Sequence, residues 1–284
     1  MRDKVCIVTG ANSGIGFEIC KALAILKAHV VLVSRNERKG IEAQESIKTL
    51  VADSSIDLVI GDLGSIESTR SLAGQLSRAY PKIDALINNA GVWMTQCELN
   101  EDGLEQSFMT NHLAPFMLNQ ILMPNLRAAA PARIVTVNSG LYVKGVVDLD
   151  KTPVGGDFGR IAAYANSKMC NVLTLKEQAR QIEGSGVTIN MVHPGVIRSN
   201  LGESNGPLGW LLVQIKRFWR TPEQGALAPV WLATDPDVAK YNGVYFNEME
   251  IMPLVEAAKD EQLAAAVWKQ CQTLCFPAQQ SNFA

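Results

Sequence analysis

Charge is scarce in this chain of 284 residues and neither sign dominates: 19% of the residues are charged, and the formal net charge is −2. Without a basic excess there is no electrostatic reason to expect a nucleic-acid partner. Uninterrupted apolar runs long enough to cross a bilayer are also missing from the sequence. No signal-peptide pattern precedes the first predicted strand, which begins at Val5. These absences predict a soluble, cytoplasmic protein.

Cysteine is sparse as well, and its six positions are scattered: Cys6, Cys20, Cys97, Cys170, Cys271 and Cys275. They form neither the double pair of a zinc site nor the dense framework of a disulfide-rich domain. Several lie within apolar runs, where a reduced thiol behaves as a small hydrophobic side chain. We therefore expect no bound metal and a reducing compartment.

Hydrophobic residues are plentiful, at 47% of the chain, which is enough to build a large core. Short apolar runs predict strands at Val5–Thr9, Val30–Ser34, Leu58–Gly61, Ala85–Asn88, Ile134–Val137, Thr188–Val192 and Val244–Phe246. Helical periodicity fills most intervals, for example at Gly16–Lys27, Ile66–Ala79, Leu113–Ala128, Ala162–Ile182, Pro222–Ala233 and Leu263–Cys275. Apolar strands separated by helices are typical of a parallel sheet covered on both faces. The prediction is one α/β domain over residues 1–284, with a seven-stranded, mainly parallel sheet.

Two stretches interrupt this alternation. Asp148–Arg160 is rich in Gly, Asp and Pro and is predicted to be a loop. Gly202–Arg220 places apolar and aromatic residues, such as Trp210 and Trp219, among basic ones such as Lys216. Three alternatives fit that pattern: a surface helix docked by its apolar side, a substrate lid at about 200–220, or a peripheral membrane contact through 208–220.

Tyr164 and Lys168 lie four residues apart in a predicted helix, so they share one face of it. A free tyrosine keeps its proton up to about pH 10, so it holds the proton too tightly for efficient acid/base catalysis near neutral pH. A neighbouring ammonium favours the phenolate and is expected to lower that pKa. The pair predicts a proton-transfer site, while the same spacing is also compatible with a half-buried ring beside a solvated amine.

A glycine-rich turn, Thr9–Gly16, follows the first predicted strand and opens the first predicted helix. Glycines permit a tight turn and a close approach of the backbone to a pyrophosphate, which a helix N-terminus attracts. Such turns also occur without a ligand, but the strand-before and helix-after context favours a dinucleotide site. The residues expected to contact the cofactor here are Gly10, Asn12, Ser13, Gly14, Ile15 and Gly16.

The second predicted strand ends at Ser34, and Arg35 follows it. Sites that prefer NAD usually place an acid at this point to accept the ribose 2′-hydroxyl, whereas an arginine suits a 2′-phosphate. Here the acid is absent and a cation is present. The sequence therefore favours NADP(H), with a solvated loop arginine as the other interpretation of Arg35.

Six motifs, in order along nearly the whole chain, resemble the short-chain dehydrogenase/reductase family. The glycine turn looks like the family's cofactor motif, and Asp62-Leu63 resembles its adenine-contacting pair. Asn111 matches its catalytic asparagine, and Tyr164 with Lys168 matches its catalytic pair. The remaining matches are Asn89, Ala90 and Gly91 in an Asn-Asn-Ala-Gly signature, and Pro194, Gly195, Val196 and Ser199 beside the loop that covers the nicotinamide. The resemblance implies a single Rossmann-type doubly wound domain with helices on both faces of the sheet.

Ser139 matches the family's catalytic serine, although the family often has two adjacent serines where this chain has Asn138-Ser139. Ser139 and Tyr164 are 25 positions apart, longer than in many members, and the Asp148–Arg160 loop accounts for the extra length. The retinol-dehydrogenase-like branch shares this long spacing, and Val192–Val196, Thr221–Ala226 and Gly243–Phe246 also resemble it. Its membrane-bound members carry an N-terminal apolar anchor that this sequence lacks. That difference argues against a retinoid as the substrate, and the branch contains many reductases of other carbonyl compounds.

The resemblance implies reversible hydride transfer between NADP(H) and a carbonyl or alcohol of an apolar small molecule. Tyr164 would donate the proton, and Lys168 would lower its pKa and bond the nicotinamide ribose. Ser139 would donate a hydrogen bond to the oxyanion, and Asn111 would support a water that relays protons. The alternative is a non-catalytic NADP-binding sensor or scaffold on the same fold. Such a protein is expected to lose part of this set, and all four residues are present.

Overall fold

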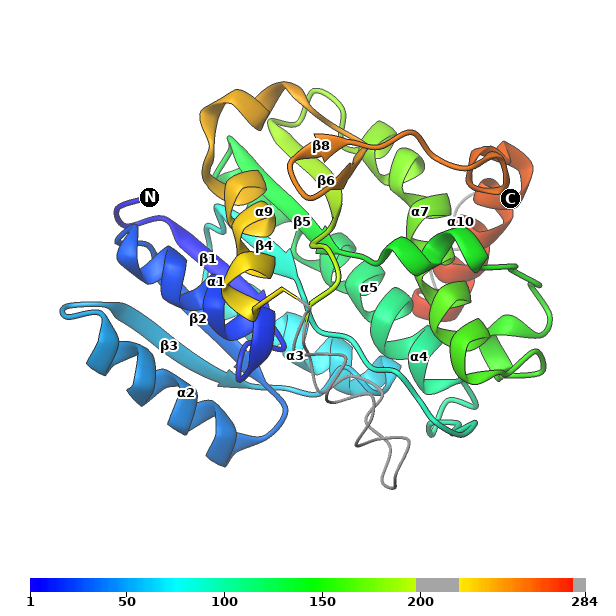
Figure 1. Cartoon of the computed structure of the whole chain (residues 1–284), viewed down its shortest axis with the longest axis horizontal. Helices are drawn as coiled ribbons and strands as arrows, with labels where there is room; N and C mark the ends of the chain where they lie inside the picture. The colour runs from blue at the N-terminus through cyan, green and yellow to red at the C-terminus, as the bar shows by residue number, and fades with distance from the viewer. Residues whose placement is uncertain (198–219, 278–284) are drawn as a thin grey trace.

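A mainly parallel sheet forms the centre of the molecule, for which the computed structural model describes residues 1–197 and 220–277 (Figure 1). Its strands are β1 (Val5–Thr9), β2 (His29–Ser34), β3 (Ser55–Ile60), β4 (Ala85–Asn88), β5 (Ala132–Val137), β6 (Val187–His193), β7 (Val244–Asn247) and β8 (Glu250–Ile251). They are ordered β3-β2-β1-β4-β5-β6-β7-β8, and only the β7–β8 pair is antiparallel. The strand order reverses between β1 and β4, which is where doubly wound folds bind their ligands.

The described residues form eight strands where the sequence predicts seven. The additional strand, β8, has two residues and pairs with the end of β7, so it is too short to leave a periodic pattern in the sequence. The mainly parallel, doubly wound α/β fold that the sequence predicts is confirmed.

Helices cover both faces of the sheet (Figure 1). On one face lie α1 (Gly14–Ile25), α2 (Glu37–Leu50) and α9 (Pro222–Thr234), whose buried side chains include Ile19, Ile47 and Leu232. On the other lie α3 (Ile66–Ala79), α5 (Ala114–Ile121), α7 (Arg160–Gln181) and α10 (Glu261–Cys275), which bury Leu72, Phe116, Leu173 and Val267. Burial on both faces explains why the central strands are continuous apolar runs.

The helix predicted at Leu113–Ala128 is divided in the structure. A π-turn, η1 (Met109–Leu113), follows the short α4 (Gln106–Phe108) and leads into α5, and α6 (Met123–Ala128) is a separate helix. Pro115 and Pro124 lie in the first turns of α5 and α6. Proline lacks a backbone N–H and is tolerated best in the first turn of a helix, so a new helix that starts with Met123 and Pro124 explains the break at Leu122. Single π-turns of this kind often lie at functional sites.

The Asp148–Arg160 stretch is a loop whose only helical turn is the 3₁₀ segment η3 (Thr152–Val154), and α7 begins at its end. The predicted lid or membrane-contact segment and Ser199 lie outside the described residues, apart from Arg220. Among the described residues, no helix combines the length and apolar character that a membrane crossing requires.

Candidate active site

The glycine-rich turn joins β1 to α1 and adopts a conformation that requires glycine. Gly10 and Gly14 have φ of +63° and +57°, a region that residues with a Cβ rarely occupy. A Cβ on Gly10 would lie 2.8 Å from the Cα atom of Ala90, so the turn packs directly against the segment that follows β4. Ser13, which precedes α1, makes no side-chain capping bond. The first N–H groups of α1 are therefore available to an anion.

The turn is fixed to the Asn-Asn-Ala-Gly segment by hydrogen bonds. The Thr9 hydroxyl accepts the N–H groups of Asn89 and Ala90, each at 3.1 Å. The Asn89 amide donates to the carbonyl oxygens of Thr9 and Gly10 at 2.9 and 3.2 Å. The expected cofactor residues of the two segments thus form one rigid wall at the carboxyl end of the sheet.

Arg35 lies just beyond β2 at the same end of the sheet. Its side chain is exposed, and no hydrogen bond or ion pair joins it to another described residue. Ser34 is buried, and its hydroxyl donates to the Asn36 carbonyl at 2.9 Å, so no carboxylate stands at this point. Asn36 in turn caps α2 by accepting the N–H of Lys39. Arg35 is thus a cation that pairs with no described residue, near the glycine turn.

Asp62 and Leu63 follow β3, the next strand along the same edge. Asp62 is exposed and accepts the Gly64 N–H at 3.0 Å, which fixes its carboxylate in a local turn. Leu63 is buried in the core, and its carbonyl accepts the Thr110 hydroxyl at 3.5 Å. Leu63 therefore links the end of β3 to the segment that carries Asn111.

Ser139, Tyr164 and Lys168 converge between the end of β5 and α7. The Ser139 hydroxyl hydrogen-bonds the Tyr164 phenol oxygen. Lys168 is 4% exposed, and its Nζ lies 3.1 Å from the Val137 carbonyl oxygen and 5.7 Å from the centre of the Tyr164 ring. No carboxylate among the described residues pairs with this ammonium. A Cβ on Gly91 would lie 3.9 Å from the Lys168 Nζ, so the ammonium also faces the expected cofactor wall.

Burial is the main influence on the pKa values of Tyr164 and Lys168. It raises the pKa of Tyr164, and the hydrogen bond from Ser139 only partly opposes that rise. Burial also lowers the pKa of the Lys168 ammonium to about 8. The expectation that Lys168 lowers the pKa of the phenol is not met here, because the ammonium is directed to the Val137 carbonyl and desolvation of the ring dominates.

Asn111 occupies the π-turn and is 1% exposed. Its side chain accepts the Val92 N–H at 2.7 Å and donates to the Val92 carbonyl at 2.9 Å. The same amide donates to the Ser167 hydroxyl at 3.0 Å, and that hydroxyl donates to the Tyr164 carbonyl at 2.7 Å. Asn111 therefore joins the segment after β4 to the helix that carries Tyr164.

A buried chain of hydrogen bonds that the sequence did not predict reaches the backbone of Asn111. The Asn171 amide donates to the Asn111 carbonyl at 2.8 Å, and its oxygen faces the Nδ1 atom of His112 at 2.9 Å. The His112 Nε2 atom lies 3.1 Å from the Sγ atom of Cys271 on α10. Burial lowers the pKa of His112 to about 4, so the ring is neutral and its Nδ1–H donates to Asn171. The C-terminal helix is thereby tied to the π-turn.

Pro194, Gly195 and Val196 follow β6, and Gly195 has φ of +89°. The Val196 carbonyl accepts the Arg220 N–H at 3.1 Å, and the Arg220 guanidinium pairs with Glu248. These contacts join Arg220, which precedes α9, to the segment that follows β6 and to the residue after β7. Pro194, Gly195 and Val196 lie at the carboxyl end of the sheet, where the other expected cofactor residues also lie.

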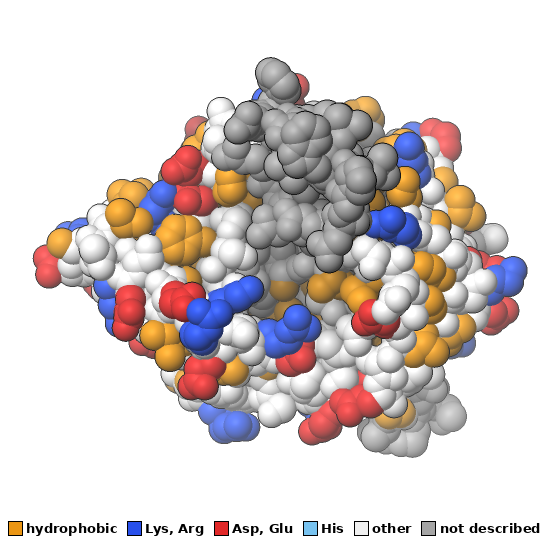
Figure 2. All heavy atoms as spheres, turned by 60° about the horizontal axis from the view of Figure 1, so that its bottom comes forward, with side chains coloured by type: hydrophobic (Ala, Val, Ile, Leu, Met, Phe, Trp, Pro, Cys, Tyr) orange, Lys and Arg blue, Asp and Glu red, His pale blue; other side chains and the backbone are white. Residues whose placement is uncertain are grey.

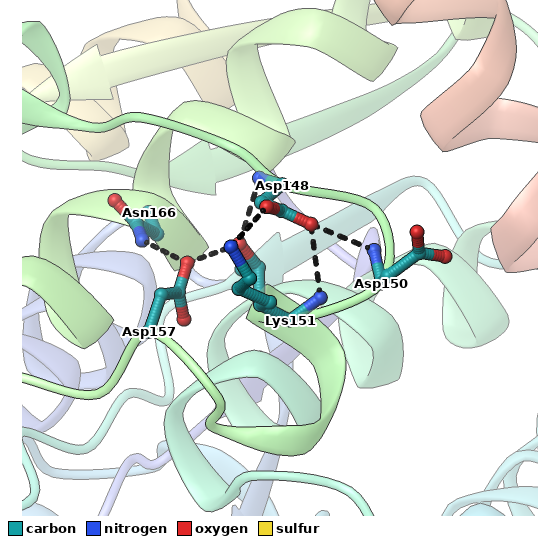
Figure 3. A network of polar contacts seen from close by, with 6 residues as sticks. Asp148, Asp150, Lys151, Asp157 and Asn166 are labelled. Carbon is teal, nitrogen blue, oxygen red and sulfur yellow. Dashed lines mark hydrogen bonds and ion pairs between the residues drawn. The ribbon is translucent and has the colours of Figure 1, made fainter.

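The long loop before α7 is held by its own polar network (Figure 3). Asp148 accepts the N–H groups of Asp150 and Lys151 and pairs with the Lys151 ammonium. Asp157 accepts the Asn166 amide at 3.0 Å, and the Asn166 oxygen accepts the Val146 N–H at 2.9 Å. Asn166 stands between Tyr164 and Lys168 in the sequence, so the loop is attached at the catalytic stretch of α7.

Trp93 is a site residue that the sequence did not reveal. Its ring stacks on that of Tyr164, with centroids 4.7 Å apart and planes inclined by 10°. Its indole N–H donates to the Arg160 carbonyl at 2.5 Å. The only sequence feature that could have identified Trp93 as a site residue is its position two residues after Gly91.

Figure 2 turns the lower side of Figure 1, where the chain leaves β6, toward the viewer. Basic, acidic and apolar side chains are interspersed over the described part of this face, without a broad field of one sign. The pattern agrees with a formal net charge of −2. Recognition of an anionic ligand on this face therefore depends on local groups rather than on a general basic surface.

Comparison with known proteins places the chain in a family. The profile described as short chain dehydrogenase matches residues 4–207. Retinol dehydrogenase 14 of Mus musculus is 34% identical, over 94% of this chain and 84% of its own, and retinol dehydrogenase 13 of Homo sapiens is 34% identical, over 95% and 84%. A crystal structure of an uncharacterized protein from Mycobacterium paratuberculosis superposes with a TM-score of 0.76, at 27% identity, over 96% of this chain and 94% of its own. The chain therefore belongs to the short-chain dehydrogenase family, in its retinol-dehydrogenase-like branch, and is a nicotinamide-dependent oxidoreductase acting on alcohols or carbonyl compounds.

Proposed function

We propose that the protein interconverts the carbonyl and alcohol forms of an apolar small molecule and uses NADP(H) in preference to NAD(H). The single observation that supports this most strongly is the convergence of Ser139, Tyr164 and Lys168 beside Gly91, in the segment that packs against the glycine turn. A buried ammonium without a carboxylate is costly to keep, and such groups cluster at functional sites.

The residues at the carboxyl end of the sheet fit a nicotinamide dinucleotide. The glycine turn would hold the pyrophosphate at the N-terminus of α1, where Ser13 makes no side-chain capping bond. Close packing fixes the turn, because a Cβ at Gly10 or Gly16 would lie 2.8 or 2.4 Å from neighbouring protein atoms. Lys168 would donate to the nicotinamide ribose. The ribose hydroxyls would then accept hydrogen bonds from an ammonium that pairs with no carboxylate among the described residues. The bound cofactor would supply or accept the hydride.

The chain's own side chains would handle the proton. In reduction, Tyr164 would donate its proton to the carbonyl oxygen, while the Ser139 hydroxyl would donate a hydrogen bond to the same oxygen. The burial that raises the pKa of Tyr164 keeps the phenol protonated at neutral pH, as an acid for reduction must be. Lys168 and Asn111 would return protons to the phenol from the solvent side.

Arg35 supports the preference for NADP(H). Its guanidinium is exposed next to the buried Ser34, at the end of β2 where a carboxylate would otherwise accept a ribose hydroxyl. A guanidinium offers two parallel donors to a phosphate, which is the group that distinguishes NADP from NAD.

A screen of carbonyls and alcohols tests the proposal. Aliphatic, aromatic and polyene aldehydes, ketones and alcohols would each be offered with NADPH, NADH or their oxidised forms, and the nicotinamide absorbance would be followed. The expected result is turnover of apolar members with the phosphorylated cofactor. Tight NADPH binding without turnover of any compound would instead support a non-catalytic sensor.

A further inference from the structure

We propose that Trp93 is a positioning residue for proton transfer: its indole holds the Tyr164 ring against Ser139 and shields one face of the phenol from water. The inference rests on the proposed function of Tyr164 as the acid. It rests equally on the stacked geometry, in which the two ring centroids are 4.7 Å apart and the planes differ by 10°.

The indole is fixed at two points on α7. Its N–H donates to the carbonyl of Arg160, the first residue of the helix, and its face covers Tyr164 one turn later. An indole that spans both positions leaves the phenol little freedom to rotate away from the Ser139 hydroxyl. Stacked aromatic pairs add about 0.5–1.5 kcal/mol beyond the area they bury, which is enough to favour one ring orientation.

The backbone that carries Trp93 is fixed by another member of the site. Both polar backbone groups of Val92 are bonded to the Asn111 side chain, which also donates to Ser167. The Ser167 hydroxyl donates to the Tyr164 carbonyl, so the contacts close a ring that runs from Tyr164 through Trp93, Val92, Asn111 and Ser167 back to Tyr164. Trp93 is the member of this ring that contacts the phenol side chain itself.

Shielding of the phenol has a measurable consequence. The ionisable groups facing Tyr164 are Lys168 on its own helix and Tyr245 on β7, with the Ser139 hydroxyl bonded to its oxygen. Burial is the largest influence on the phenol and raises its pKa. Removing the indole would admit water to one ring face, and the pKa of Tyr164 would fall.

Three variants separate the ring from the rest of the side chain. Trp93→Phe keeps an aromatic face but loses the N–H, and Trp93→Leu keeps apolar bulk but loses the stack. Trp231→Phe is the matched control, because that indole packs edge-on against Phe246 on the α9 side of the sheet. Each protein would be assayed for kcat, KM, NADPH affinity and the pH dependence of kcat.

Trp93→Leu is expected to lower kcat by about 10- to 100-fold, because a displaced reacting group costs about that much, while NADPH affinity stays within twofold. Trp93→Phe is expected to recover most of the rate, and the alkaline limb of the Trp93→Leu profile to move to lower pH. An unchanged kcat and pH profile in Trp93→Leu would overturn the proposal. So would a change in KM alone, since that would make Trp93 a substrate contact.

A titration without substrate keeps this test independent of the proposed function. The ultraviolet difference spectrum between each protein and its Tyr164→Phe counterpart reports ionisation of Tyr164 alone. A lower pKa of Tyr164 in Trp93→Leu than in the wild type supports the shielding role, and an equal pKa contradicts it. Failure of the wild type to turn over any carbonyl or alcohol would refute the proposed function and leave this titration interpretable.

Discussion

The two ends of the parallel sheet both gather ionisable side chains, but they treat charge differently. At the amino end, His29 lies between Asp57 at 2.8 Å and the Ser55 hydroxyl at 2.7 Å, and the Tyr80 hydroxyl also donates to Asp57. A depression of about 680 Å³ opens there, and the four of its lining side chains just named, His29, Ser55, Asp57 and Tyr80, bond one another. At the carboxyl end, Lys168 is buried and pairs with no described carboxylate.

The difference between the two ends supports the proposal that the carboxyl end is the functional one. A cluster whose donors and acceptors satisfy one another is stable by itself and has nothing left to offer a ligand. A desolvated ammonium that bonds only one backbone carbonyl raises the free energy of the folded protein. The presence of such a group therefore points to a role in binding or catalysis. Residue types alone would not separate the ends, because a serine, a histidine and an aspartate also meet at the amino end.

The largest difference between the two ends of the sheet is expected when one serine hydroxyl is removed from each. Ser139→Ala should lower kcat about 10²- to 10³-fold, as loss of an oxyanion donor does in other enzymes. Ser55→Ala removes a hydroxyl bonded to His29 and should leave kcat/KM unchanged. Steady-state kinetics of both variants test this. A Ser139→Ala enzyme at wild-type rate would mean that Asn138 or a backbone group orients the carbonyl.

Cofactor choice is the next largest effect. Charge-assisted hydrogen bonds contribute about 1.5–3 kcal/mol, which corresponds to a preference for NADPH over NADH of about ten- to hundredfold. Replacing Ser34 with Asp and Arg35 with Leu should erase or invert that preference in kcat/KM. Arg38→Leu, which removes a guanidinium already paired with Glu42, is the control and should change it little. Equal use of both cofactors by the wild type would contradict the assignment of Arg35.

Stability as a function of pH tests the cost of the buried ammonium. Burial lowers the pKa of Lys168 from 10.5 to about 8, so above pH 8 the native protein has lost a proton that the unfolded chain still binds. Unfolding free energy from this group therefore rises with pH, by about 2 kcal/mol between pH 8 and 9.5 at 1.36 kcal/mol per unit. Denaturant titrations at pH 7 should give Lys168→Met its largest gain in unfolding free energy over the wild type. At pH 9.5 that gain should be smaller by about 2 kcal/mol.

Lys4→Met supplies the matched comparison at the amino end. Lys4 is about half exposed and pairs with Asp84 at 2.7 Å, and exposed pairs of this kind contribute about 0–1 kcal/mol. Its loss should produce a small, nearly constant difference from wild type over the same pH range. A Lys168→Met difference that stays as flat as that of Lys4→Met would mean that Lys168 is not desolvated.

The smallest effect is expected within the cluster at the amino end of the sheet, formed by His29, Ser55, Asp57 and Tyr80. Asp57→Asn should change unfolding free energy by no more than about 1 kcal/mol, because the carboxylate is about half exposed and its partners remain accessible to water. Activity should stay within about twofold of wild type, as for a surface change far from the site. Loss of more than tenfold in kcat/KM would break the comparison and make the amino end part of the functional machinery.

The fold was predictable from sequence where strands are buried on both faces. The predicted bounds of β1 and β4 agree with the structure, because short apolar runs bounded by turn residues define them. The edge strand β3 was predicted from Leu58 but begins at Ser55. Asp57 lies within it, and a carboxylate bonded to His29 and Tyr80 at an open edge leaves no apolar pattern.

The site was predictable only where contacts follow a sequence motif. Tyr164 and Lys168 share a helix, and Ser139 and the glycine turn match recognisable patterns, so each was visible before the fold was known. Trp93 and Asn171 were not, because their partners are distant in sequence and belong to no short motif. The pKa of Tyr164 was misjudged for the same reason: spacing reveals the neighbouring cation but not the burial of the ring.

The most direct test of the central claim is the turnover of Tyr164→Phe against wild type, with NADPH affinity measured in parallel. The substitution removes the phenol oxygen and keeps the ring that stacks on Trp93. General acid catalysis contributes about 10²–10⁴-fold, so kcat should fall by that factor while cofactor affinity stays nearly intact. Turnover by the Phe variant within about tenfold of wild type would contradict the account and require another proton donor at the carboxyl end of the sheet.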